Sequence, residues 1–206
     1  MPADIRSCMI VLASISFIVL SGCISTKPQT TPDLTPTTGC ERSVTGDIAT
    51  AQRHLERGRP ETALHYIEGL KSCLEAQTSL AYLQTAMDAF HSAGQLNPAW
   101  VHWQRAYGRA SELRDNKSVV ALEGWATAFR SSYVMLEFAK SARLPKISYD
   151  GPFADEATLR QVQAITQGSG FSIDSERIGF WLLPGRYRVG ESVEQLAAGT
   201  VYREGT

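Results

Sequence analysis

The residues best suited to chemistry in this chain are its cysteines, and Cys23 has the most informative neighbours. It follows an apolar run, Met9 to Leu20, and two small residues, Ser21 and Gly22. The run has the length of a signal-peptide core and falls well short of the roughly 20 residues that span a bilayer. Small residues suit a peptidase, which needs an extended, uncrowded backbone. The pattern is typical of a leader that is removed during export.

The segment Leu20-Ser21-Gly22-Cys23 resembles the lipobox of bacterial lipoproteins, and the resemblance covers Met1 to Cys23. It implies that residues 1–22 are a signal peptide and that Cys23 becomes a lipid-bearing first residue. Several acyl chains anchor a protein stably, whereas one holds it only marginally. In the sorting rule of these lipoproteins, Ile24 in place of Asp implies the outer membrane, with the body facing the periplasm. The alternative is an ordinary signal peptide cut elsewhere, with Cys23 unmodified.

Two other cysteines, Cys40 and Cys73, remain after the leader is removed, and the predicted compartment permits disulfides. Cys73 lies about 14 residues beyond the turn that joins the first two expected helices, or roughly 20 Å along the second helix at 1.5 Å per residue. An antiparallel first helix returns to that level near Thr45, so residues 41–44 can bring Cys40 across the gap. We therefore predict a Cys40–Cys73 disulfide, with two free thiols as the alternative.

The other reactive side chains form no recognisable catalytic group. Asp155 and Glu156 are typical of a first helical turn, where carboxylates favour the helix dipole. No nucleophile elbow, P-loop or dinucleotide-binding glycine set is present. The formal net charge is -1 and there is no polybasic run, so nucleic acid is not an expected partner. The histidines lack the spacing of metal ligands: His54, His65, His91 and His102. We expect no enzyme, no metal and no other cofactor.

Residues 23–43 are predicted to form a lipidated tether rich in Thr and Pro. The tether has almost nothing to bury and should stay disordered. Its prolines favour polyproline II, so some 15 residues reach on the order of 45 Å at about 3.1 Å each. Such a tether gives the folded part reach toward a partner, or merely clears the lipid headgroups.

Residues 44–144 have helical periodicity and glycine landmarks between the expected helices. Gly58 and Gly94 can each adopt the left-handed turn that ends a helix, and Pro60 and Pro98 suit a first turn. Asn97 is a good N-cap. The landmarks repeat with a period of about 36 residues, in the range of helix-hairpin solenoids.

This pattern resembles the tetratricopeptide repeat, in two divergent copies over roughly Val44 to Leu113. The residues that match the repeat are Ala51, Ala63 and Ile67 in the first copy and Phe90, Ala99, Trp103 and Ala106 in the second. Leu70, Met87 and the missing closing prolines depart from it, and a generic helical bundle is the alternative. A third helical segment, from about Val119 to Arg143, is expected to cap the array, either as one long helix or as a tight third hairpin with a break at Gly124 or Ser131-Ser132.

The residue composition changes at about Pro145, and residues 145–206 are predicted to form a small C-terminal module. We expect strands at 147–149, 171–174, 178–183, 186–189 and 200–202, and a helix over 158–166. The segment Leu183–Val189 resembles the β-hairpin of transthyretin-like or PEGA-like modules, with its turn at Pro184-Gly185. The expected fold class is mainly α, with TPR-like hairpins followed by a small α+β or β module.

Two functions follow from these expectations. The first is a lipid-anchored scaffold or accessory subunit that binds a protein complex of the cell envelope. The lipoprotein resemblance implies secretion, pilus, outer-membrane or cell-wall machinery as the partner. Its candidate partner-binding residues are Arg53, Arg57 and Arg59, although a solvated helix end explains them as well. The alternative is a glycan or small-ligand module that uses Phe180, Trp181 and Tyr187. We expect Trp100, Trp103 and Tyr107 to be core residues rather than a ligand platform.

Overall fold

A computed structural model describes Cys40 and residues 43–203. The predicted signal peptide, Cys23 and most of the predicted tether lie outside these residues. The described residues belong to one compact unit. No helix in the described part of the chain is long and apolar enough to cross a membrane.

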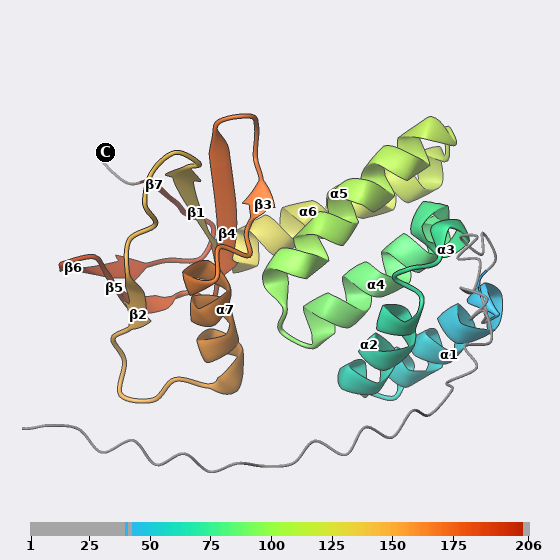
Figure 1. Cartoon of the computed structure of the whole chain (residues 1–206), viewed down its shortest axis with the longest axis horizontal. Coiled ribbons are helices and arrows are strands. Elements are labelled where there is room, and N and C mark those ends of the chain that lie inside the picture. The colour runs from blue at the N-terminus through green and yellow to red at the C-terminus, as the bar shows by residue number, and fades with distance from the viewer. Residues whose placement is uncertain (1–39, 41–42, 204–206) are drawn as a thin grey trace, which may run out of the picture. The chain divides into compact units, whose positions relative to one another are not determined.

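Helices come first along the described chain, and strands follow (Figure 1). The first six helices are α1 (Val44–Glu56), α2 (Pro60–Gly69), α3 (Leu74–Thr78), α4 (Leu80–Ser92), α5 (Leu96–Glu112) and α6 (Asn116–Ser132). A seventh helix and seven strands make up the rest of the described chain. The expected fold class, mainly α followed by a small α+β module, is confirmed.

Local sequence sets the ends of the helices. Gly58 and Gly94 have φ angles of 65° and 70°, so the predicted glycine turns are confirmed. Pro60 stands in the first turn of α2, as expected. The side chain of Ser43 caps α1 and that of Asp115 caps α6. Asn97 is not an N-cap as predicted, because α5 begins one residue earlier, at Leu96.

Small residues allow the helices to pack closely. Ala51 on α1, Ala63 on α2 and Ala86 on α4 are fully buried, and α1 packs against both α2 and α4. Helix α4 forms a second pair with α5, and α6 packs on α5. The arrangement is a row of antiparallel helices, and its assignment to the tetratricopeptide repeat stays a prediction.

The prediction that the third helical segment continues to Arg143 is wrong. Helix α6 ends at Ser132, and residues 134–139 form strand β1 (Val134–Ala139). The run Val134-Met135-Leu136-Glu137-Phe138 is almost continuously apolar, and such a run suits a strand buried on both faces as well as a helix. The change from helices to strands therefore comes at Tyr133 rather than after Leu144.

The strands form two sheets. The first has the order β3-β4-β1-β7 and contains β3 (Phe171–Ser172), β4 (Arg177–Leu182) and β7 (Val201–Arg203) beside β1. The second has the order β2-β5-β6, with β2 (Ile147–Tyr149), β5 (Gly185–Val189) and β6 (Ser192–Leu196). Helix α7 (Glu156–Thr166) joins β2 to β3 in sequence and packs against β2 and β4.

The predicted hairpin across Pro184-Gly185 is wrong. Strand β4 pairs with β1 and β3, whereas β5 pairs with β2 and β6. Pro184-Gly185 therefore carries the chain from one sheet to the other. A proline-glycine pair between two apolar strands fits both geometries, so sequence alone does not separate them.

The first sheet has apolar residues on both faces. Leu136, Phe138 and Phe180 join a core that also contains Ile165 of α7 and Tyr187 of β5. The residues between them point the other way, since side chains alternate along a strand. Trp181 and Phe171 on that second face join a cluster with Trp100 of α5 and Phe129 of α6. The sheet is thus packed between α7 with the second sheet on one side and the helical array on the other.

Two buried amide side chains connect the helical array to β4. The Oδ1 of Asn97 accepts a hydrogen bond of 2.7 Å from the Trp181 backbone N–H. The Gln161 side chain of α7 accepts from the Leu183 N–H and donates to the Gly94 carbonyl, over 2.8 and 3.2 Å. Both side chains are 3% exposed. They give hydrogen-bond partners to the backbone N–H of Trp181 in β4 and to that of Leu183 just after the strand.

Candidate binding surfaces

A cavity of about 360 Å³ lies where α5 and α6 meet the first sheet. Its walls are mostly aromatic and aliphatic, with a few polar groups at the edge. The residues that line it are Trp100, Trp103, Gln104, Arg130, Met135, Phe171, Ile173, Trp181, Gly199, Thr200 and Val201. We call it the aromatic cavity. Its volume falls at the lower end of the range for small-ligand pockets.

The aromatic rings of this cavity are packed against one another. Trp100 stacks on Trp103 with 4.4 Å between ring centroids, and it meets Trp181 at 5.0 Å and 59°. Phe171 is nearly parallel to Trp181, with centroids 6.0 Å apart. Trp100, Phe171 and Trp181 are each at most 5% exposed. The walls are therefore held in place before any ligand arrives.

Hydrogen-bond donors predominate among the polar groups of the cavity. The Arg130 guanidinium lies over the rings of Trp100 and Trp103, 5.0 and 5.6 Å from their centroids. The buried Nε1–H of Trp181 has no acceptor among the described residues. Gln104 adds an amide, and no carboxylate lines the cavity. Its electrostatics favour a group rich in acceptor oxygens.

A second hollow, of about 450 Å³, adjoins the aromatic cavity along α5 and α6. It shares Trp103 and Arg130 with the cavity, and Tyr107, Glu123, Ala126 and Thr127 complete its lining. The Tyr107 hydroxyl donates to the Glu123 carboxylate over 3.1 Å, and this bond raises the Tyr107 pKa. The second hollow thus offers both acceptors and donors.

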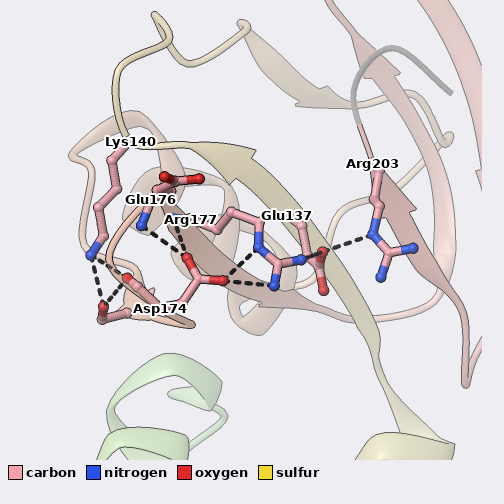
Figure 2. A network of polar contacts seen from close by, with 7 residues as sticks. Glu137, Lys140, Asp174, Glu176, Arg177 and Arg203 are labelled. Carbon is pink, nitrogen blue, oxygen red and sulfur yellow. Dashed lines mark hydrogen bonds and ion pairs between the residues drawn. The ribbon is translucent and has the colours of Figure 1, made fainter.

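A network of charged side chains extends from the same face of the first sheet (Figure 2). Glu137 of β1 is 6% exposed and accepts hydrogen bonds from Arg177 and Arg203, over 3.0 and 2.8 Å. Arg177 also binds Asp174, which lowers the Asp174 pKa. Lys140 donates to the carbonyl of Asp174 over 2.6 Å. These contacts tie β1 to β7 and to the turn before β4.

A third hollow lies on the helical array, among α1, α4 and α6. It measures about 360 Å³ and is lined by Gln52, Leu55, Gln84, Thr85, Met87, Asp88, Ala121, Leu122 and Trp125. We call it the helix groove. Asp88 has no hydrogen-bond or ion-pair partner among the described residues, and desolvation raises its pKa. An acidic group with this environment gains from a cationic neighbour.

The three arginines predicted as a partner-binding patch are exposed. Arg53 lies in the last turn of α1, while Arg57 and Arg59 lie in the turn before α2. Arg53 bends back to its own helix, where its Nη2 donates to Thr50 over 2.9 Å. None of the three lines the aromatic cavity, the second hollow or the helix groove.

The structure separates the three aromatic residues that were predicted to bind a ligand. Phe180 and Tyr187 are fully buried in the core between the sheets. Trp181 lies on the opposite face of β4 and lines the aromatic cavity. Sequence reasoning missed that Trp100 and Trp103 share this cavity. Their i, i+3 spacing put them on one helical face, but nothing in the sequence placed that face beside β4.

The structure also shows where the predicted cysteine pair and two of the histidines lie. Cys40 and Cys73 form the expected disulfide, with their Cα atoms 5.3 Å apart. Cys23 lies outside the described residues. His91 donates to or accepts from the Tyr133 hydroxyl at 2.9 Å, and His102 stacks on Phe90. Within residues 43–203, no group of three or more His, Cys, Asp or Glu side chains is arranged to hold a metal ion.

The chain matches no protein family, no curated protein and no solved structure.

Proposed function

We propose that this protein is a lipid-anchored outer-membrane lipoprotein that binds a partner of the cell envelope and is not an enzyme. The predicted leader and lipidation site at Cys23 supply the anchor, and the Thr/Pro-rich segment after it supplies reach. The Cys40–Cys73 disulfide supports this location, because disulfides persist in oxidising compartments such as the periplasm. The body then acts as a scaffold or accessory subunit of an envelope assembly.

The helix groove is the surface that we assign to the protein partner, and the observation that carries this is Asp88. Its carboxylate lies unpaired beside the apolar side chains of Leu55 and Trp125 and the amide of Gln84. This set suits a segment that carries an apolar side chain next to a lysine or arginine, with its backbone bonded by the amide. The arginine patch at the α1–α2 turn lies outside the groove and is not needed for this mode of binding.

Site-specific photo-crosslinking in the periplasm tests this assignment. A crosslinking amino acid at Gln84 or Ala121, in the groove, should capture one and the same envelope protein. Placed at Glu61 or Glu68, exposed positions of α2 outside the groove, it should not. Asp88→Lys should abolish the product, whereas Glu61→Lys should leave it unchanged. Equal products from both faces, or none from the groove, would refute the assignment.

The anchor is tested separately. In the wild type, [³H]palmitate should label the protein, and the label should be lost in Cys23→Ser together with outer-membrane fractionation. A Cys8→Ser variant is the matched control, since Cys8 lies in the predicted leader. An unlabelled wild type, or a Cys23→Ser variant that fractionates as before, would contradict lipid anchoring while leaving the groove assignment open to its own test.

A further inference from the structure

We propose that the chain's own tether covers the helix groove, with Lys27 paired to Asp88 and Pro28 on the apolar wall of the groove. Lys27 and Pro28 lie outside the described residues. The inference rests on the proposed function, because it assigns a resident occupant to the groove that an envelope partner must displace.

The helix groove lacks a positive charge beside its carboxylate. Asp88 is exposed and has no hydrogen-bond or ion-pair partner among the described residues, and no lysine or arginine lines the groove. Leu55 and Trp125 are half-buried, so part of each side chain is open to an apolar group. The surface thus combines an aromatic wall, an aliphatic wall and an acceptor for a cation.

The tether carries the matching groups next to each other. Within residues 23–39 the only lysine or arginine is Lys27, and Pro28 follows it directly. Proline-rich segments favour polyproline II, and aromatic-lined grooves bind that conformation at a low cost in chain entropy. Pro28 supplies the apolar contact for Trp125, and Lys27 supplies the charge for Asp88.

The segment is long enough to reach the groove. Cys40, its point of attachment, is fixed by the disulfide to Cys73 at the start of α3. Gln52, the groove residue of α1 nearest to that end, lies about 14 Å along the helix from Ser43 at 1.5 Å per residue. Helix α4 is one helix spacing away, about 8–10 Å. Residues 29–39 span about 34 Å in polyproline II, which exceeds this path.

Attachment to the same chain makes a weak contact sufficient. A short link of this kind gives an effective concentration on the order of 1 mM. A contact with a Kd of about 1 mM then fills the groove in about half of the molecules. Such a contact neutralises Asp88 and still yields to a protein partner that binds more tightly.

Occupation by the tether couples partner binding to distance from the bilayer. Lys27 follows Cys23, the proposed lipidation site, after only about 12 Å of chain at about 3.1 Å per residue. Docking of Lys27 therefore holds the groove close to the anchor. A partner that displaces Lys27 frees the whole tether to extend, so the groove is covered near the membrane and open at a distance from it.

Carbodiimide coupling of the purified full-length protein in detergent tests the contact directly. The reagent joins an ammonium to a carboxylate without a spacer, so it reports groups that touch. Peptide mapping should find a Lys27–Asp88 product, with less of it at about 1 M salt, because salt screens exposed ion pairs. Lys27→Gln should remove the product. Lys71→Gln is the matched control and should leave it unchanged, since Lys71 is exposed and lies outside the groove.

Isotope labelling decides which copy supplies the segment. In an equal mixture of ¹⁴N and ¹⁵N protein, the product should join peptides of the same label. No Lys27–Asp88 product, or one that joins the two labels, would overturn the proposal. Neither the lipid nor an envelope partner takes part in this measurement, so a negative result leaves the proposed function to its own tests.

Competition with the partner gives a second readout. If the tether fills the groove in about half of the molecules, Lys27→Gln should raise capture of the envelope protein by a photo-crosslinker at Gln84 about twofold. Lys71→Gln should leave the capture at its wild-type level. Equal capture by Lys27→Gln and the wild type would contradict displacement of the tether.

Discussion

At the scale of single residues, Asn97 stabilises the contact between α5 and β4 through one buried hydrogen bond. Its side chain is 3% exposed and accepts from the Trp181 N–H over 2.7 Å. Asn97→Ala leaves that N–H buried without a partner, so we expect the free energy of unfolding to fall by about 1–3 kcal/mol. Urea denaturation measures it. Asn116→Ala, at the exposed start of α6, should change stability by less than about 0.5 kcal/mol.

The second residue-scale prediction concerns acid sensitivity. Burial, aided by the Arg105 charge, lowers the pKa of His102 from 6.5 to about 4. Between these values the unfolded chain binds a proton that the folded chain does not, so stability falls as the pH drops from 6.5 to 4. The loss from His102 is at most about 3 kcal/mol. Burial also lowers the pKa of His91, which adds to the same trend.

Unfolding by urea at several pH values checks this trend. His102→Phe keeps a ring against Phe90 and removes the titration, so its stability should depend less on pH between 6.5 and 4. His65→Gln, at an exposed position of α2, should keep the wild-type dependence. A His102→Phe profile parallel to that of the wild type would exclude His102 as a source of the acid sensitivity.

At the scale of elements, the close contact between β3 and β4 gives a sharp prediction. A Cβ atom on Gly179 would lie 2.5 Å from Cζ of Phe171, and Phe171 is fixed between Trp100 and Trp181. Gly179→Ala should therefore destabilise the protein by about 1–3 kcal/mol. Gly108→Ala on α5 meets no atom within 4 Å and should stabilise by about 0.5–1 kcal/mol. Thermal unfolding of the two variants would contradict the argument if they changed in the same direction.

The helices were more predictable from the sequence than the strands were. Gly58, Pro60 and Gly94 act locally, through the φ angles that they allow, and their effects came out as expected. The identity of β1 depends instead on β4 and β7, which pair with it from far along the chain. An apolar run such as Val134–Phe138 fits a helix or a strand, and tertiary pairing decides.

The same contrast holds for the binding surfaces. The sequence singled out Trp181 and the disulfide, since an aromatic strand and an even pair of cysteines are local features. It could not bring Trp100 and Trp103 of α5 to Trp181 of β4, because that contact depends on how two layers pack. It also placed Phe180 beside Trp181 as a ligand residue, although neighbours in a strand face opposite sides of the sheet.

At the scale of the whole molecule, the disulfide joins the start of the described fold to the end of its first helical pair. Cys40 and Cys73 are 33 residues apart, and the loop that they close holds α1 and α2. We expect reduction to lower the free energy of unfolding by about 3–4 kcal/mol in the chain-entropy model. Urea unfolding with and without dithiothreitol measures this, and non-reducing peptide mapping should find the Cys40–Cys73 pair. Two alkylatable thiols in the native protein would contradict it.

The layers also limit how the molecule can be divided. A cut after Leu144 would leave β1 with the helices and remove its partners β4 and β7. The apolar face of β1 and the side chains of Trp100 and Phe129 would then lose their cover. Point variants in the full chain are therefore the sound way to separate the helix groove from the aromatic cavity.

The place of β1 also sets an order of events during synthesis of the chain. The two strands that flank it begin at Arg177 and Val201, so β1 is synthesised well before either neighbour. At about 5–20 residues per second, the roughly 60 residues between β1 and β7 take several seconds to emerge. During that interval β1, an apolar strand, has neither of its partner strands. We expect a chaperone that binds newly synthesised chains to bind at β1.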